Sequence, residues 1–154
     1  MEDKKKHTLR EKIEAFEHVC RDKGIKLTHQ RMEIFREIVN SAAHPSAEEI
    51  HKRLKLKLPM ISLDTIYRTL SAFEKFGIIT RVQVLYDKGR FDTNLTPHHH
   101  LICTQCKGIL DFYWPTFDKI KVPSETKKWG KILAKQVELR GICESCLKRV
   151  QKRK

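Results

Sequence analysis

The sequence lacks a long apolar run, an apolar leader and an internal repeat. None of its hydrophobic runs approaches the length that a membrane-spanning helix needs, so we expect no membrane segment. The first residues, MEDKKKHTLREK, are polar and lack the apolar region of a secretory signal. We therefore expect a cytoplasmic protein, in which disulfides are rare. The five cysteines then need another explanation, and metal binding is the leading one.

Acidic residues are scarce relative to basic ones. The 154 residues include 32 Lys and Arg but 19 Asp and Glu, giving a formal charge of +13. The basic excess is 6 in residues 1–90 and 7 in residues 91–154, so no single tail carries it. The positive electrostatic field of such a protein favours binding to polyanions, and nucleic acid is the first candidate. The 40% of hydrophobic residues supports a packed core and argues against wholesale disorder.

The first half of the chain has the pattern of helices followed by a hairpin. Apolar residues recur at helical spacing, with Thr28, Ser46 and Ser62 as N-caps and Ser46 forming a capping box with Glu49. The predicted helices cover residues 9–22 and the stretches after Thr28, Ser46 and Ser62, followed by strands at 78–86 and from Arg90. This order is typical of a winged helix-turn-helix, in which the last helix enters the major groove of DNA.

The second half changes character. It has strand patterns at 99–104, 108–113 and 131–140, and helical patterns at 115–122 and 143–150. We therefore expect an α+β protein: a winged-helix domain over residues 1–90, a hinge over 91–97 and a small zinc-binding α/β domain over 98–154.

Two Cys-x-x-Cys pairs, Cys103/Cys106 and Cys143/Cys146, are separated by 36 intervening residues. Each turn can direct two thiolates to one ion, and four sulfurs without an open position are the structural zinc arrangement. The alternatives are redox pairs or core cysteines, and we favour Zn²⁺ because this half of the chain is small for a self-sufficient core. Cys20 stands alone on an apolar helix face and is expected to be a buried hydrophobe.

A histidine triplet precedes the first cysteine pair. In an extended chain His98 and His100 share a face, while His99 points the other way. With Asp92 and Asp111 they form a mixed nitrogen and oxygen set suited to Fe²⁺, Mn²⁺ or Zn²⁺. The alternatives are a solvated histidine loop and ordinary surface carboxylates.

Several segments, in this order and spacing, resemble the ferric uptake regulator family over roughly residues 8–150. They are LTHQR (27–31), AHPSAEEI (43–50), DTIYRTL (64–70), FD (91–92), HHHLICTQC (98–106), ILDF (109–112) and GICESC (141–146).

The resemblance implies a homodimeric repressor of double-stranded operator DNA, with an N-terminal winged helix and a C-terminal dimerisation domain. It implies a structural zinc on the four cysteines and a regulatory Fe²⁺ or Mn²⁺. The regulatory ligands would be His44, Asp92, His98, His100 and Asp111. The ion would then fix the angle between the two domains, so that metal and operator strengthen each other's binding.

Aspartate at both 92 and 111 resembles the peroxide-sensing branch, where Fe²⁺ and hydrogen peroxide oxidise a histidine matching His44 or His98 and the operator is released. The alternative is an iron- or manganese-responsive repressor without oxidation chemistry, and Arg68 after Tyr67 resembles that branch. Many relatives have a third metal site with a histidine in the strand at 131–140. Ala134 and Lys135 occupy that place here, so we expect no third site.

The outward face of the fourth helix carries the candidate DNA contacts, Thr65, Tyr67, Arg68 and Ser71. The alternative is that Tyr67 packs on its own domain and Arg68 is solvated. Further basic residues could face phosphates or water: Lys52, Arg53, Lys55, Lys57, Arg81 and Arg90.

Two other protein classes fit part of the pattern. A metallo-hydrolase could use the His/Asp site, but the sequence has no Glu or third His placed as a base, so we expect no enzyme and no catalytic residue. A zinc-ribbon interaction module would have the cysteines alone as its functional site.

Overall fold

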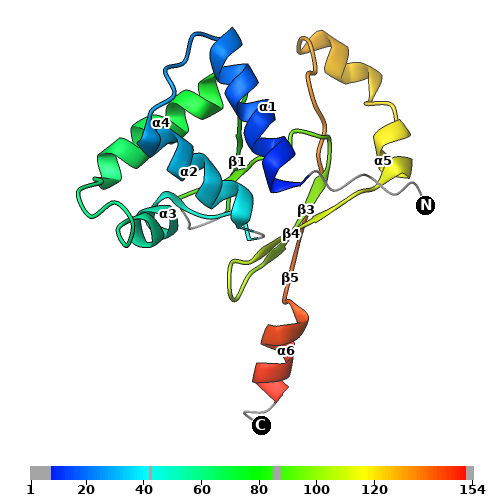
Figure 1. Ribbon diagram of the computed structural model, residues 1–154. Helices are drawn as coiled ribbons and strands as arrows, with labels where there is room; N and C mark the ends of the chain where they lie inside the picture. Colours follow the sequence, from blue (N-terminus) through cyan, green and yellow to red (C-terminus); the bar gives the residue numbers. More distant parts are fainter. Residues whose placement is uncertain (1–7, 42, 85–87, 152–154) are drawn as a thin grey trace. The chain divides into compact units, whose positions relative to one another are not determined.

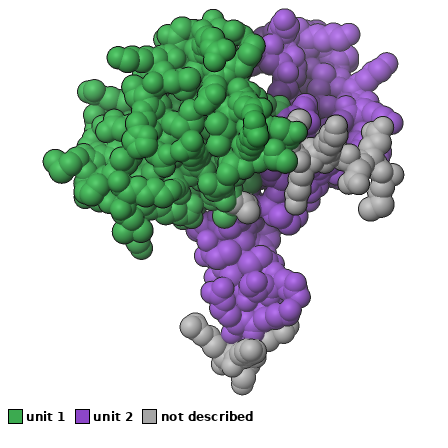
Figure 2. Space-filling view, in the orientation of Figure 1, with its two compact units in different colours: residues 1–95 green, residues 96–154 purple. Residues whose placement is uncertain are grey.

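The computed structural model describes residues 8–41, 43–84 and 88–151. The chain divides into two compact units, unit 1 (residues 1–95) and unit 2 (residues 96–154), which Figure 2 colours separately. None of the helices in the described ranges is both long and apolar enough to cross a membrane.

In the described part of unit 1, four helices precede a two-stranded antiparallel sheet (Figure 1). These elements are α1 (Leu9–Asp22), α2 (His29–Asn40), α3 (Ala47–Leu54), α4 (Leu63–Lys75), β1 (Thr80–Val82) and β2 (Arg90–Asp92). The sheet pairs Arg81 with Phe91. The prediction of a strand over 78–86 is therefore wrong for residues 78–79 and 83–84, and residues 85–86 and the predicted turn residue Asp87 lie outside the described ranges.

The helices of unit 1 begin where the sequence places hydroxyl side chains. Thr28, Ser46 and Ser62 each accept a hydrogen bond from the backbone N–H three residues on. The predicted capping box is confirmed, because the Glu49 carboxylate accepts from the Ser46 N–H at 2.9 Å. Each cap stabilises its helix by about 1 kcal/mol.

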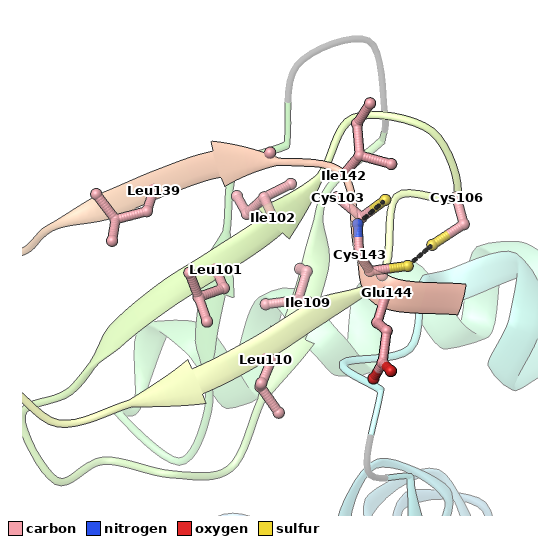
Figure 3. A pocket seen from close by; sticks show the side chains of 12 residues that line it. Leu101, Ile102, Cys103, Cys106, Ile109, Leu110, Leu139, Ile142, Cys143 and Glu144 are labelled. Carbon is pink, nitrogen blue, oxygen red and sulfur yellow. Dashed lines mark hydrogen bonds between the residues drawn. The ribbon is translucent and has the colours of Figure 1, made fainter. Parts of the chain in front are cut away.

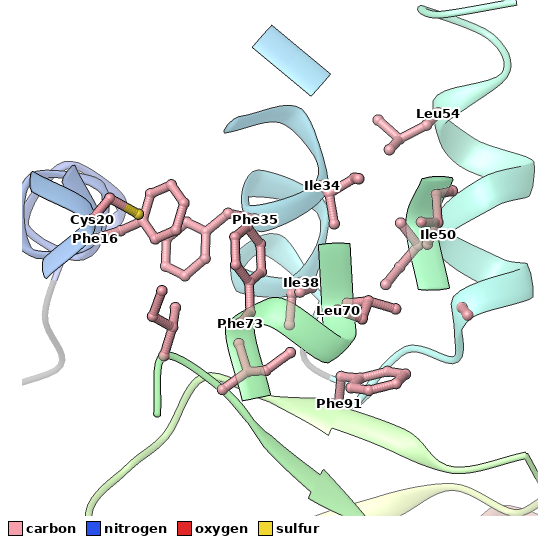
Figure 4. Close-up of a cluster of buried hydrophobic side chains, with 14 of the residues drawn as sticks. Phe16, Cys20, Ile34, Phe35, Ile38, Ile50, Leu54, Leu70, Phe73 and Phe91 are labelled. Carbon is pink, nitrogen blue, oxygen red and sulfur yellow. The ribbon is translucent and has the colours of Figure 1, made fainter. Parts of the chain in front are cut away.

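The core of unit 1 is built around three phenylalanine rings (Figure 4). Phe16 of α1 stacks on Phe35 of α2 with ring centroids 3.9 Å apart, and Phe73 of α4 meets Phe16 edge-on at 5.2 Å. Aromatic pairs of this kind contribute about 0.5–1.5 kcal/mol beyond the area they bury. Cys20 is fully buried beside them, as expected for a small hydrophobe.

Unit 2 is organised by a three-stranded sheet of order β4-β3-β5. The central strand β3 pairs antiparallel with β4 and parallel with β5, so that His100 lies opposite Asp111 on one side and Glu138 on the other. The elements are β3 (His99–Cys103), β4 (Ile109–Phe112), α5 (Pro115–Lys119), the 3-10 helix η1 (Ser124–Lys128), β5 (Glu138–Gly141) and α6 (Glu144–Gln151).

Two sequence predictions for unit 2 need correction. The strand predicted over 131–140 is wrong for 131–137 and occupies Glu138–Gly141 instead, because its ladder with β3 starts at the His100–Glu138 pair. The helix predicted over 115–122 ends at Lys119, and η1 was not predicted.

Candidate metal centres

The four cysteines of the two Cys-x-x-Cys pairs come together in unit 2. Cys103 ends β3 and Cys106 lies in the turn before β4, while Cys143 and Cys146 lie at and just inside the start of α6. Their sulfurs all lie within 4.8 Å of one another. Cys106 Sγ and Cys143 Sγ are 3.8 Å apart (Figure 3). The parallel pairing of β3 with β5 causes this, since it sets Cys103 opposite Gly141, two residues before Cys143.

The cysteine turns also supply backbone donors to sulfur. The Cys143 N–H donates to Cys103 Sγ at 3.3 Å, and this bond is the main cause that lowers the pKa of Cys103 to about 6. The pKa of Cys146 is raised to about 12, first because its sulfur hydrogen-bonds with Cys143 and then because of burial. The cluster thus combines a sulfur favoured as thiolate with one that holds its proton, and a divalent cation would displace such protons. All four are free thiols.

The second ligand group of unit 2 consists of His98, His100 and Asp111. The Nε2 atoms of the two histidines lie 2.9 Å apart, and they lie 3.6 Å and 3.5 Å from Asp111 Oδ1. The sheet register explains the arrangement, because Asp111 is the direct cross-strand partner of His100. His98, two residues before His100, points to the same side, as the alternation of an extended chain predicts.

Two hydrogen bonds orient these imidazoles. His98 Nδ1 lies 2.6 Å from the Thr96 carbonyl oxygen, which only accepts, so Nδ1 carries a proton, and in the neutral imidazole Nε2 is then the nitrogen with the lone pair. Gln136 Nε2 donates to the His98 carbonyl at 2.9 Å and lies 3.2 Å from His100 Nδ1. Partners of this kind fix the orientation of metal-binding histidines. Sequence reasoning missed Gln136, because its spacing from the triplet carries no motif.

His99 faces the opposite side and belongs to the packing of unit 2. Its ring lies 5.3 Å from those of Phe112 and Phe117, its Nδ1 accepts from the Val137 N–H, and its Nε2 lies 3.3 Å from Asp118 Oδ1. The strand therefore divides the triplet into two ligand candidates on one face, His98 and His100, and one packing residue, His99, on the other, and all three are buried.

Unit 1 brings His44 and Asp92 together. His44 Nε2 lies 3.3 Å from Asp92 Oδ2, while Asp92 Oδ1 accepts from the Asn94 N–H at 2.7 Å. The Phe91 N–H donates to the Pro45 carbonyl at 3.1 Å, which ties β2 to the segment before α3. His44 has a φ of 47°, a left-handed conformation that histidine tolerates better than most residues. This pairing joins positions 48 residues apart in the sequence, and only the family resemblance had assigned His44 a role.

The candidate DNA contacts lie on α4, and three of them, Thr65, Tyr67 and Arg68, have partners in unit 1. Tyr67 packs against the core, and its hydroxyl donates to Glu48 at 2.8 Å, while Arg68 is 82% exposed and pairs with Asp64. Thr65 contacts the Ser62 cap, and Ser71 is exposed.

The other basic candidates differ in their surroundings. Arg90 pairs with Glu49 at 2.8 Å and is largely buried, whereas Arg81 pairs with Glu74 and Lys57 with Glu37. In unit 2, Lys135, at the position where relatives would have a third site, donates to the carbonyls of Phe117 and Ile120. Its ammonium group is thus engaged with the end of α5.

Comparison with known proteins points to one family. The sequence model of the ferric uptake regulator family matches residues 22–140. The chain is 34% identical over 140 residues to the peroxide-responsive repressor PerR of Staphylococcus epidermidis, covering 91% of each chain. It is 32% identical over 143 residues to the peroxide operon regulator of Bacillus subtilis, covering 93% of this chain and 96% of that one.

Solved structures agree with this. The ferric uptake regulator of Helicobacter pylori superposes with a TM-score of 0.74 at 25% identity, covering 92% of this chain and 95% of that one. PerR of Streptococcus pyogenes superposes with a TM-score of 0.51 at 27% identity, covering 87% and 92%.

Proposed function

Because the chain belongs to the ferric uptake regulator family, we propose that it is a metal-dependent, homodimeric repressor that releases operator DNA after hydrogen peroxide oxidises a histidine ligand. The observation that carries the peroxide response is the 34% identity, over 91% of each chain, to a peroxide-responsive repressor. The two aspartates of the ligand set, Asp92 and Asp111, support the same branch.

Unit 1 would bind DNA as a winged helix. Its order of three packed helices, α2 to α4, followed by an antiparallel hairpin suits that module, with α4 entering the major groove. Arg68 and Ser71 are exposed on α4 and accessible to a base edge or a phosphate. The formal charge of +13 supplies the long-range attraction to DNA.

Unit 2 would form the dimer through its sheet. Leu101 on β3 lies in register with Leu110 on β4 and Leu139 on β5, and the three side chains are 39%, 63% and 44% exposed. They line a shallow groove of about 360 Å³ that runs to the cysteine turns (Figure 3). Exposed contiguous apolar patches of this kind mark interaction surfaces, and a second copy of the chain is the occupant that we propose.

The two ligand groups would share one regulatory ion. His44 and Asp92 belong to unit 1, whereas His98, His100 and Asp111 belong to unit 2, so an ion bound by all five would fix the angle between the units. If operator DNA requires the same angle, metal and DNA strengthen each other's binding by about 1–3 kcal/mol, or roughly 5–150-fold. Zn²⁺ suits the four sulfurs, and Fe²⁺ or Mn²⁺ suits the mixed nitrogen and oxygen set.

The peroxide response would follow from a change in one ligand. His44, Asp92, His98, His100 and Asp111 would hold Fe²⁺, which when bound would supply the chemistry that cleaves the O–O bond of hydrogen peroxide. A ring carbon of His44 or His98 would take up one oxygen atom and lose two electrons, and the other oxygen atom would leave as water. The oxidised ring would have both nitrogens protonated and no lone pair to donate, so the ligand set would lose one member and the angle between the units would no longer be fixed.

A mass measurement on digested protein tests this proposal. The protein is loaded with Fe²⁺ without oxygen, treated with hydrogen peroxide and cleaved with trypsin. We expect one added oxygen atom on His44 or His98 and none after loading with Mn²⁺. The two peptides contain internal controls, since His51 accompanies His44 between Arg36 and Lys52, and His99 adjoins His98.

The position of the added oxygen decides the result. Fragmentation spectra that place it equally on His51 and His99 would indicate unspecific oxidation and contradict the proposal. Unmodified His44 and His98 after Fe²⁺ and peroxide would favour the second candidate, an iron- or manganese-responsive repressor without oxidation chemistry. Arg68 after Tyr67 favours that candidate, as it resembles the iron-sensing branch.

A further inference from the structure

Glu48 connects three elements of unit 1 through a single carboxylate oxygen. It lies in the first turn of α3, where its Oε1 accepts a hydrogen bond from the Tyr67 hydroxyl of α4 at 2.8 Å. The same oxygen lies 2.9 Å from the ammonium nitrogen of Lys88, two residues before β2. Glu48 Oε1 of α3 therefore contacts both the Tyr67 hydroxyl of α4 and the Lys88 ammonium group of the hairpin.

The charges of this cluster are well defined. The pKa of Glu48 is lowered to about 2, first by the hydrogen bond from Lys88, so the carboxylate is ionised at neutral pH. The pKa of Tyr67 is raised by burial and by the Glu48 hydrogen bond, so the hydroxyl keeps its proton. Lys88 is 72% exposed and Glu48 35%, so the pair lies at the surface of unit 1.

The contacts of Glu48 are those that a DNA phosphate would make. An anionic oxygen that accepts from a lysine ammonium and a tyrosine hydroxyl is the usual arrangement at a protein–phosphate contact. Tyr67 is a predicted DNA contact, and Lys88 belongs to the hairpin that would be the wing. In the absence of DNA, the Tyr67 hydroxyl and the Lys88 ammonium both contact the Glu48 carboxylate of the same chain.

We propose that Glu48 is a built-in phosphate mimic that holds the Tyr67 hydroxyl and the Lys88 ammonium and thereby weakens binding to non-operator DNA. The proposal rests on the DNA-binding function proposed above. A chain of charge +13 attracts any duplex, and each lysine that neutralises a phosphate adds affinity without sequence information. Lys88 paired with Glu48 contributes little to such unspecific contacts, which raises the ratio of specific to unspecific binding.

The test compares three variants, Glu48→Gln, Lys88→Gln and the double variant, in the full chain loaded with zinc and Mn²⁺. The probe is a short fluorescent duplex of mixed sequence, titrated by anisotropy at a series of KCl concentrations. Glutamine keeps an acceptor for Tyr67 but removes the charge. We expect Glu48→Gln to bind about three- to tenfold tighter, with a logarithmic salt slope steeper by about 0.9, the value for one added phosphate contact.

The double variant identifies the source of the gain. If released Lys88 makes the new contact, Glu48→Gln/Lys88→Gln returns to the salt slope of the unmodified protein, and Lys88→Gln alone changes the slope little. Glu14→Gln is the matched control, because it removes one negative charge from an exposed i,i+4 pair with Arg10 on α1. Urea unfolding verifies that each variant is folded.

The outcomes separate the two proposals. Equal affinity and slope for Glu48→Gln and Glu14→Gln, with DNA binding intact, would overturn the role of Glu48 and leave the repressor function standing. A gain that persists in the double variant would also overturn it, since Lys88 would not be the released group. Failure of the unmodified protein and every variant to bind duplex DNA at low salt would overturn the repressor function and this inference with it.

Discussion

The two units differ in what holds them together. In the described residues, the buried apolar cluster of unit 1 extends from Phe16 to Phe91 and draws on all four helices. The fully or nearly buried hydrophobic residues described in unit 2 are few, namely Ile102, Cys103, Ile109 and Cys146, while many large apolar side chains are exposed. We therefore expect packing to hold unit 1 together, and we expect a metal cross-link and a covering partner to stabilise unit 2.

The largest effect should come from removing one sulfur of unit 2. Cys143→Ser leaves three thiolates for a site that needs four, and structural zinc contributes about 10–16 kcal/mol in small metal-dependent domains. We expect loss of the zinc and of amide-exchange protection in unit 2, with protection in unit 1 retained, measured by metal analysis and hydrogen exchange.

The control for that variant is Cys20→Ala, which removes a sulfur from the core of unit 1. It should keep the full zinc content. Loss of protection in both units of Cys143→Ser would show that unit 1 does not fold independently, and the comparison would fail.

A core substitution in unit 1 should destabilise unit 1 and leave unit 2 with its metal intact. Phe73→Ala deletes the ring that Phe16 and Phe35 contact and should cost about 3–5 kcal/mol of unfolding free energy. Urea unfolding followed by hydrogen exchange should show destabilised α1 to α4 and unchanged zinc content. Zinc release at the same urea concentration as helix loss would indicate one cooperative unit instead of two.

The exposed sheet face of unit 2 can be tested without unfolding either unit. Leu110→Glu places a charge at the β4 end of the Leu110–Leu101–Leu139 row and should weaken the dimer at least tenfold, about 1.4 kcal/mol. Analytical ultracentrifugation over a range of concentrations measures this. Leu56→Glu, at an 87% exposed site of unit 1, is the control that should leave the association unchanged.

The orientation of the ligand histidines in unit 2 depends on an uncharged neighbour. Gln136→Leu removes the donor to the His98 carbonyl and should reduce Mn²⁺ affinity by about 10–100-fold, the usual range for outer partners of metal ligands. Calorimetric titration with Mn²⁺ gives the affinity, and the zinc content should stay constant. An unchanged affinity would mean that the strand alone orients His98 and His100.

The smallest expected effect is the loss of stability of unit 1 at acidic pH. Because the pKa of Glu48 is lowered to about 2 from an ordinary value of 4.5, its contribution to stability is present above pH 4.5 and is lost as the pH falls toward 2. Since the pair is exposed, this contribution is below about 1 kcal/mol. Urea midpoints at acidic pH should fall less steeply for Glu48→Gln than for the unmodified protein, and parallel curves would contradict this.

Local signals in the sequence were sufficient for the helices of unit 1 and for the grouping of the four cysteines. Thr28, Ser46 and Ser62 define helix starts by chemistry that acts within three residues, and the Cys-x-x-Cys turns are equally local. Sequence prediction failed where the structure of a segment depends on its pairing with another segment that is distant in the sequence. A strand was predicted to begin at residue 131, but the β3 ladder begins with Glu138.

The ligand groups show the same limit. The spacing of His98 and His100 predicted a shared face, and the register of β3 with β4 adds Asp111. His44 has no local pattern of its own; its meeting with Asp92 depends on the Phe91–Pro45 hydrogen bond, and resemblance to a family was the sole indication. Gln136 contacts His100, which is 36 residues away in the sequence. Glu48 contacts Tyr67 and Lys88, which are 19 and 40 residues away. No sequence motif predicts contacts of this kind.

The parallel pairing of β3 with β5 also dictates an order of events during synthesis. All of unit 1 is synthesised before Cys143 is added to the chain. The helices of unit 1 can therefore pack before the Cys143/Cys146 pair is available to join the Cys103/Cys106 pair. Closing a loop of this length carries an entropic cost that an arriving ion offsets. We therefore expect metal binding by the four cysteines to be the last step of folding, so that chains made without the ion would have a folded unit 1 and an unfolded unit 2.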